Sequence, residues 1–122
     1  MLNDRIEAKW VDAFHRVFHL CKVQPGEAVA ILSETQSRAL NVHLAELALA
    51  RTGATVFHVV VPTPKQDAPV PVRSTGASVA LTGQTAALES LKAAGLVVDL
   101  TVEGLLHAPE LPQILSGGAR VM

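Results

Sequence analysis

Three short apolar runs, alternating with segments of helical pattern, constrain the fold of this chain more than any other feature. The runs cover residues 28–32, 55–61 and 96–100 and consist mainly of aliphatic side chains. Runs of this length and composition predict β-strands, and the first run, which lacks polar alternation, is expected to be buried on both faces. Strands that alternate with helices predict βαβ units, and therefore a mainly parallel sheet.

The segments around these runs carry the helical pattern. Residues 4–22 place apolar side chains at steps of three and four, which predicts an amphipathic helix. Residues 38–52 predict a second helix, and Gly53 suits the left-handed position just past its end. Apolar side chains lie on nearly opposite sides of this second helix, so we expect both the sheet and another element to cover it. Residues 83–94 predict a third helix.

The end of the chain predicts one more helix and the start of one more strand. Pro109 and Glu110 suit a first helical turn, because proline lacks only a spare N–H there and a carboxylate meets the positive end of the helix dipole. Residues 117–118 close that helix, and residues 119–122 begin a strand. Strands usually continue for about five or six residues, so we expect a chain truncated within its last strand.

The prediction is therefore a single α/β domain over residues 1–122, with a three-layer, Rossmann-like architecture, a small, mainly parallel sheet and right-handed crossovers. Four prolines fall within ten residues after the second strand, and they predict a long extended loop over residues 62–78.

Composition narrows the class of protein. A chain of 122 residues with 49% hydrophobic and 17% charged residues can bury one core, which disfavours disorder. The net charge of −1, without any basic run, disfavours a nucleic-acid partner. Cys21 is the single cysteine, so the sequence holds no disulfide framework and fits a reducing compartment. No apolar run is long enough for a signal peptide or a membrane span, and we predict a cytoplasmic protein without a membrane partner.

His107 is the leading candidate for a chemical role. It follows the strand at residues 96–100, and ligands in open α/β sheets bind beyond the carboxyl ends of strands. An imidazole there can accept or donate a proton near neutral pH. The competing interpretation is a histidine that only closes a loop. Asp99 and Glu103 could orient this imidazole, although an acid at a strand end more often accepts hydrogen bonds from nearby backbone N–H groups.

Other polar residues are weaker candidates. His15 and His19 have the spacing of two ligands on one metal, but the glutamate of the zinc motif is missing and no third ligand is evident. A solvated helix face is the favoured interpretation, and we predict no metal ligands in this chain. Ser33 and Thr35 could bind an oxyanion at the end of the first strand, although helix capping is favoured for these residue types.

The remaining candidates have simpler interpretations. Cys21 lies on the apolar face of the first helix, where a thiol in the core is expected. His43 and His58 lie within predicted regular elements and are expected to be packing or surface residues. Neither a Gly-x-Gly-x-x-Gly motif nor a Walker loop follows the first strand, so nucleotide cofactors lack their main support.

One series of segments resembles a known family. It consists of Ala80–Gly83 continuing to Ala94, Leu96–Asp99, Leu105–Glu110, Gln113–Leu115 and Gly118–Arg120. This series is similar to the 2,5-dihydroxypyridine 5,6-dioxygenase family, in a wider group of metalloenzymes shared with the aminopeptidase T type of leucyl aminopeptidases. The resemblance covers nearly the whole chain and is weakest from Pro62 to Gly76. Family members are much longer, so the resemblance implies that this chain is their N-terminal domain.

The resemblance also implies chemistry. In the family, a non-haem Fe(II) opens a pyridine ring with O₂ in nicotinic acid degradation, and its ligands come from the C-terminal half, so we expect the isolated chain to be inactive. The implied partners are a small aromatic substrate and O₂. Leu105, Leu106 and His107 are implied to face the substrate, with His107 as a hydrogen-bonding or acid–base residue. Deprotonation of a ring hydroxyl by such a group would make the ring electron-rich enough for attack by O₂.

Two alternatives stay open. The chain could be the N-terminal domain of an aminopeptidase T-like metallopeptidase, where it would help to position a peptide. It could also be a non-catalytic module that associates with itself. Truncation would uncover the second face of the helix at residues 38–52 and the sheet edge after Met122, so we expect homo-oligomers.

Overall fold

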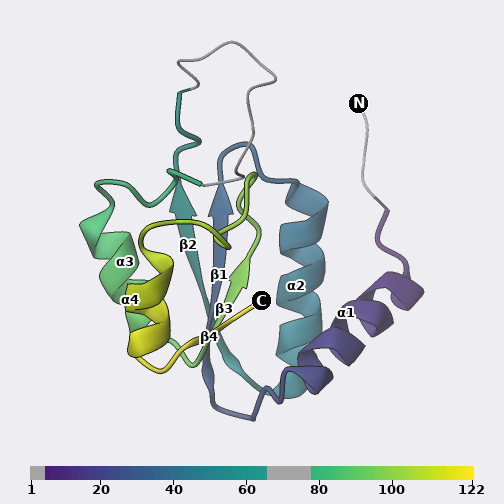
Figure 1. Ribbon diagram of the computed structural model, residues 1–122. Coiled ribbons are helices and arrows are strands. Elements are labelled where there is room, and N and C mark those ends of the chain that lie inside the picture. The colour runs from purple at the N-terminus through teal and green to yellow at the C-terminus, as the bar shows by residue number, and fades with distance from the viewer. Residues whose placement is uncertain (1–4, 66–77) are drawn as a thin grey trace.

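The computed structural model describes residues 5–65 and 78–122 of the chain. Its elements occur in the predicted order: α1 (Ala8–Leu20), β1 (Ala28–Glu34), α2 (Ala39–Thr52), β2 (Thr55–Val61), α3 (Thr85–Lys92), β3 (Leu96–Asp99), α4 (Leu111–Ser116) and β4 (Arg120–Val121). The strands form a four-stranded sheet in the order β2-β1-β3-β4, and all neighbouring pairs are parallel (Figure 1). The predicted α/β class with a parallel sheet is confirmed.

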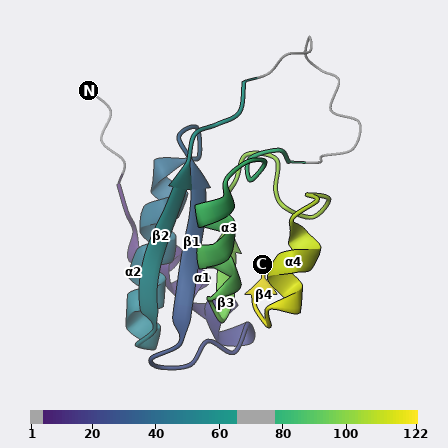
Figure 2. The same ribbon diagram turned by 90° about the vertical axis from the view of Figure 1, so that its left-hand side faces the viewer.

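Helices cover both faces of this sheet. Helices α1 and α2 pack on one face, and α3 and α4 pack on the other (Figure 2). Successive side chains of a strand point to opposite faces. Ile31 of β1 therefore packs on the face that α1 and α2 cover, and Leu32 packs on the face that α3 and α4 cover. Both side chains are fully buried. The predicted burial of the first strand on both faces is therefore confirmed.

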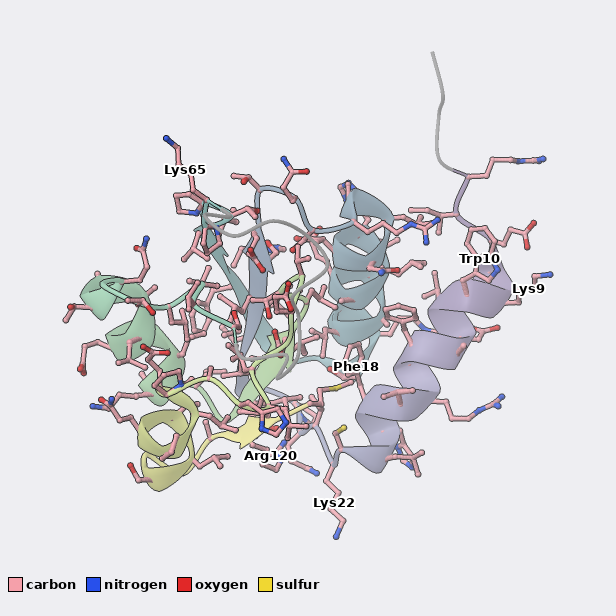
Figure 3. The ribbon with its side chains drawn as sticks, turned by 45° about the horizontal axis from the view of Figure 1, so that its top comes forward. Lys9, Trp10, Phe18, Lys22, Lys65 and Arg120 are labelled. Atoms are coloured by element: carbon pink, nitrogen blue, oxygen red, sulfur yellow. The ribbon has the colours of Figure 1, made fainter. Side chains whose placement is uncertain are left out.

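Helix α1 is the second element that covers α2. Phe18 of α1 is 1% exposed and packs with Ala45 and Leu49 of α2, between the two helices (Figure 3). The amphipathic pattern of α1 explains this contact, because its apolar stripe needs a partner surface. The expectation of an uncovered second face on the helix at residues 38–52 is wrong. Self-association stays a prediction, but it loses the support of that face.

Several predicted boundaries differ from the structure. Helix α4 begins at Leu111 rather than at Pro109, and its first-turn proline is Pro112. Gly53 ends α2 in the left-handed conformation, with φ of 80°, as predicted. Residues 62–65 form neither helix nor strand, whereas most of the predicted loop at 62–78 lies outside the described residues.

The capping role expected of Ser33 and Thr35 is wrong. Strand β1 continues to Glu34, so Ser33 is a buried strand residue. The N-cap position of α2 is taken by Arg38, which makes no side-chain capping hydrogen bond. The expectation failed because the strand is two residues longer than its apolar run.

The topology defines where a ligand site is expected. The connection from β1 to β2 runs through α2 on one face, and the connection from β2 to β3 runs through α3 on the opposite face (Figures 1 and 2). Strands β2 and β3 therefore flank β1, and the winding reverses between β1 and β3. Open α/β sheets bind ligands at such a switch point, beyond the carboxyl ends of the strands.

Candidate functional site at the carboxyl end of the sheet

Two acidic residues stand at the switch point between β1 and β3. Glu34 is the last residue of β1, and Asp99 is the last residue of β3. The register pairs Leu32 with Asp99, so Glu34 lies two residues beyond that pair. Glu34 is only 5% exposed. Both carboxylates accept hydrogen bonds from the loop at residues 100–107, which we call the β3 loop.

Asp99 organises this loop through both of its carboxylate oxygens. Its Oδ1 accepts hydrogen bonds from the backbone N–H of Thr101 at 3.0 Å and from the Thr101 hydroxyl at 2.6 Å. Its Oδ2 accepts one from the backbone N–H of Leu105 at 2.6 Å. The Thr101 hydroxyl oxygen accepts a further bond from Gly104 N–H, and Gly104 has a φ of 79° that favours glycine. The prediction that a strand-end acid binds local N–H groups is confirmed for Asp99.

Glu34 and Ser37 join the end of β1 to the same loop. Glu34 Oε2 accepts a hydrogen bond from the backbone N–H of Val102 at 2.5 Å. The Ser37 hydroxyl donates to the carbonyl oxygen of Leu100 at 2.6 Å and accepts from the N–H of Glu34 at 2.8 Å. The segments that follow β1 and β3 are thus tied together across the switch point.

A second hydroxyl pair ties β1 to β2. The backbone N–H of Thr63 donates to the Thr35 hydroxyl at 3.1 Å, and the N–H of Gln36 donates to the Thr63 hydroxyl at 2.9 Å. The roles of Glu34, Ser37 and Thr63 were missed at the level of sequence. Their common signal is a polar side chain just at or after a predicted strand, which parallel strands bring to one end of the sheet.

The structure separates the three residues predicted to face a substrate. Leu105 is 1% exposed and packs in the core between the sheet, α3 and α4. Leu106 is 76% exposed, and His107 is also exposed. Within the described part of the chain, no group forms a hydrogen bond to the His107 imidazole. Leu106 and His107 are therefore available to a ligand, whereas the Leu105 side chain serves the core.

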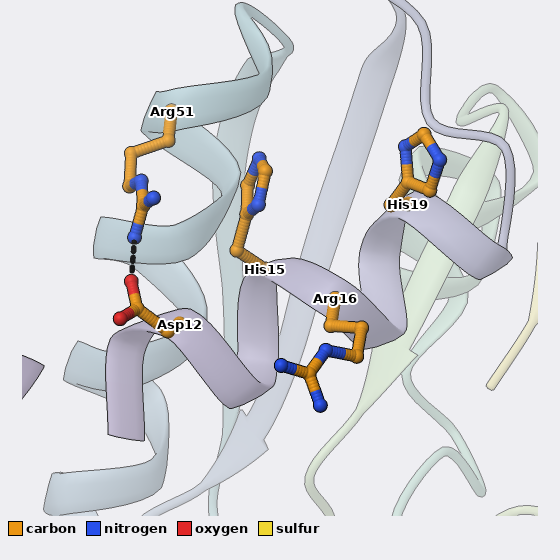
Figure 4. Close-up of a pocket in the computed structure, with 5 residues that line it drawn as sticks. All are labelled: Asp12, His15, Arg16, His19 and Arg51. Atoms are coloured by element: carbon orange, nitrogen blue, oxygen red, sulfur yellow. Dashed lines mark hydrogen bonds and ion pairs between the residues drawn. The ribbon is translucent and has the colours of Figure 1, made fainter. Parts of the chain in front are cut away.

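The histidines of α1 lie at a different place. His15 and His19 line a groove of about 400 Å³ between α1 and α2, together with Asp12, Arg16 and Arg51 (Figure 4). Asp12 and Arg51 form an ion pair at 2.7 Å across this groove. The described residues contain no group of three or more His, Cys, Asp or Glu arranged to hold a metal ion. These described residues therefore do not by themselves provide an iron site.

The remaining predicted candidates are surface or helix-end residues. His58 Nε2 lies 2.5 Å from Glu46 Oε1 on α2, and His43 is exposed. Cys21 is partly exposed at the end of α1, and its thiol lies 3.6 Å from the sulfur of Met122. The expectation of a core thiol is thus only partly met.

The amino end of the sheet holds a different kind of carboxylate contact. Glu27 precedes β1 and accepts two hydrogen bonds from the Arg120 guanidinium of β4, at 2.8 and 3.1 Å. These bonds lower the pKa of Glu27 and raise that of Arg120, against a smaller opposing effect of burial in each case. Gly95 leaves room for this carboxylate, since a Cβ there would collide with Glu27 Oε2.

Comparison with known proteins assigns the family. The family model of 2,5-dihydroxypyridine 5,6-dioxygenase matches residues 9–122 of this chain. The chain belongs to this dioxygenase family. A 2,5-dihydroxypyridine 5,6-dioxygenase of Pseudomonas putida is 35% identical over 117 residues, which are 94% of this chain and 33% of the relative.

A solved structure supports the same assignment. The 2,5-dihydroxypyridine dioxygenase from Pseudomonas putida KT2440 matches with a TM-score of 0.84 and 34% identity. The match covers 97% of this chain and 34% of that dioxygenase. The resemblance found in the sequence is confirmed, and the chain spans about a third of the length of both dioxygenases. No described helix is long and apolar enough to span a membrane.

Proposed function

We propose that this chain is the N-terminal, substrate-side domain of an enzyme that opens the ring of 2,5-dihydroxypyridine with O₂. The family match over residues 9–122 carries the proposal, because that family and its Pseudomonas relative are named for this reaction. The topology supports it, since the exposed pair Leu106 and His107 follows β3 at the switch point where α/β sheets bind ligands.

In this proposal, His107 binds a ring hydroxyl of the substrate and accepts its proton. The imidazole is exposed, and a neutral imidazole has one ring nitrogen that can accept a hydrogen bond or a proton. Loss of the hydroxyl proton places negative charge on the ring, which favours attack by O₂. Leu106, beside it and 76% exposed, offers an apolar contact to the flat face of the ring.

Fe(II) is the cofactor proposed for the complete enzyme, where it would bind and activate O₂. Its ligands would lie outside this chain, as the family resemblance implies, and the described residues offer no three-ligand group. Degradation of nicotinic acid and a cytoplasmic location belong to the same proposal. The single cysteine supports that location, because it fits a reducing compartment.

The test uses the complete gene product that contains this chain. Intact mass establishes its length, and the protein is then loaded with Fe(II) without oxygen and mixed with 2,5-dihydroxypyridine and O₂. We expect equal consumption of the pyridine and of O₂. A product that ignores the pyridine but cleaves peptides contradicts the proposal in favour of an aminopeptidase. A product of 122 residues with neither activity favours a non-catalytic module.

A further inference from the structure

Side chains hold the backbone of the β3 loop at closely spaced points. The backbone carbonyl oxygen of Leu100 accepts a hydrogen bond from a side chain, and four backbone N–H groups donate to side-chain oxygens: those of Thr101, Val102, Gly104 and Leu105. Loops without regular structure usually leave such groups to water and are among the more mobile parts of a protein. Here the held groups lie immediately before Leu106 and His107, the exposed pair of the same loop.

We propose that Asp99 and Glu34 are positioning residues, which fix the β3 loop and thereby hold Leu106 and His107 in one arrangement at the switch point. The benefit for ring opening rests on the proposed function. The ordering of the loop does not, because it follows from hydrogen bonds that are independent of any substrate.

Residue type supports a specific role for the two acids. A carboxylate can only accept hydrogen bonds, and its bonds to N–H groups are stronger than those of neutral acceptors. Within the described residues, neither Asp99 nor Glu34 forms an ion pair with Lys or Arg. Backbone N–H groups of the β3 loop are therefore their main partners, although burying a charged side chain such as that of Glu34 is costly. The hydrogen bonds of Asp99 and Glu34 therefore serve to hold the β3 loop in place.

The two acids differ in a way that an amide substitution reveals. Asp99 uses both oxygens as acceptors, so the NH₂ group of Asp99→Asn must face a backbone N–H, which is also a donor. Glu34 uses Oε2 toward the loop, so Glu34→Gln can still turn its carbonyl oxygen to Val102. The geometry predicts that amide replacement disrupts the loop at Asp99 and is tolerated at Glu34.

Hydrogen exchange of single amides in the 122-residue chain tests this prediction without any substrate. We expect Asp99→Asn to accelerate exchange at Leu105 by about tenfold or more, the effect of losing one hydrogen bond to a charged group. Glu34→Ala should accelerate exchange at Val102, and Glu34→Gln should restore most of the protection. The amide of Ile31 in β1 reports on global unfolding. Unchanged protection of Leu105 in Asp99→Asn overturns the proposal.

Thr101 provides a second variant if Asp99→Asn does not fold. Thr101→Val removes the hydroxyl that bonds to Asp99 and to Gly104 and keeps the side-chain shape. It should accelerate exchange at Gly104, and Thr101→Ser should restore protection. Equal exchange in Thr101→Val and Thr101→Ser contradicts the proposed tether.

Activity of the complete protein then separates positioning from stability. For Asp99→Asn we expect kcat for ring opening to fall by about tenfold or more, with a smaller change in KM, because misplacing a reacting group lowers the rate of the bound complex. Glu34→Gln should recover most of the kcat lost in Glu34→Ala. If Asp99→Asn accelerates amide exchange in the β3 loop but leaves kcat and KM at their wild-type values, the proposed positioning role is overturned. An inactive wild type overturns the proposed function instead, and loop exchange then decides whether Asp99 and Glu34 fix the loop.

Discussion

The two ends of the sheet use carboxylates in different ways. At the amino end, the main partner of Glu27 is the charged side chain of Arg120, and Glu27 accepts one further hydrogen bond from the backbone N–H of Gln24. At the carboxyl end, Glu34 and Asp99 bind backbone N–H groups of the β3 loop. A side-chain pair joins two elements but leaves their backbone conformation open, whereas a carboxylate on several amides dictates the path of a loop. Carboxylates thus fix the conformation of a loop at the end of the sheet where ligands are expected.

The largest expected effect lies in the β3 loop itself, between neighbouring leucines. Leu105→Ala should lower the free energy of unfolding by about 2–5 kcal/mol, because it leaves a cavity in the core. Leu106→Ala should change it by less than about 0.5 kcal/mol, because that side chain is exposed. Urea unfolding of the 122-residue chain measures both. Equal effects would show that the loop does not hold Leu105 inside and Leu106 outside.

Ser37 tests the link between β1 and the β3 loop. Ser37→Ala leaves Leu100 O and Glu34 N–H without their side-chain partner, and we expect a loss of about 1–2 kcal/mol in urea unfolding. The matched control is Ser90→Ala on the exposed side of α3, where the hydroxyl bonds only to Ala86 O and the loss should be negligible. If Ser37→Ala costs no more than this control, the link is not a stabilising feature.

The smallest effect is expected at the amino end. Arg120→Gln should cost less than about 1 kcal/mol at pH 7, because the Arg120 side chain is 44% exposed and water and salt screen the pair. The folded-state pKa of Glu27 is lowered from 4.5, so the pair stabilises the fold above that pH and loses its effect as pH falls through the lowered value. Urea unfolding should show that the difference in free energy of unfolding between wild type and Arg120→Gln is smaller at pH 3 than at pH 7. A larger difference at pH 3 than at pH 7 contradicts this account of Glu27.

Periodicity predicts most of this fold, because strand and helix patterns are local properties of the sequence. The parallel sheet, the left-handed Gly53 and the buried first strand follow from such patterns. The packing of α1 on α2 and the contacts of Glu34 and Ser37 do not, because they depend on which strands become neighbours. The sequence also cannot show which leucine of the Leu105–Leu106 pair points inward, since a tether from Asp99 fixes that turn of the loop.

The central claim is that the β3 loop presents His107 to the substrate of the complete enzyme. The most direct measurement is kcat for ring opening of 2,5-dihydroxypyridine by the complete, Fe(II)-loaded protein and its His107→Gln variant. His43→Gln serves as the control, because His43 is an exposed histidine of a different element, helix α2. The account predicts a loss of about a hundredfold or more for His107→Gln, typical of removing a general acid or base, and no loss for the control. Wild-type kcat in His107→Gln would contradict the claim.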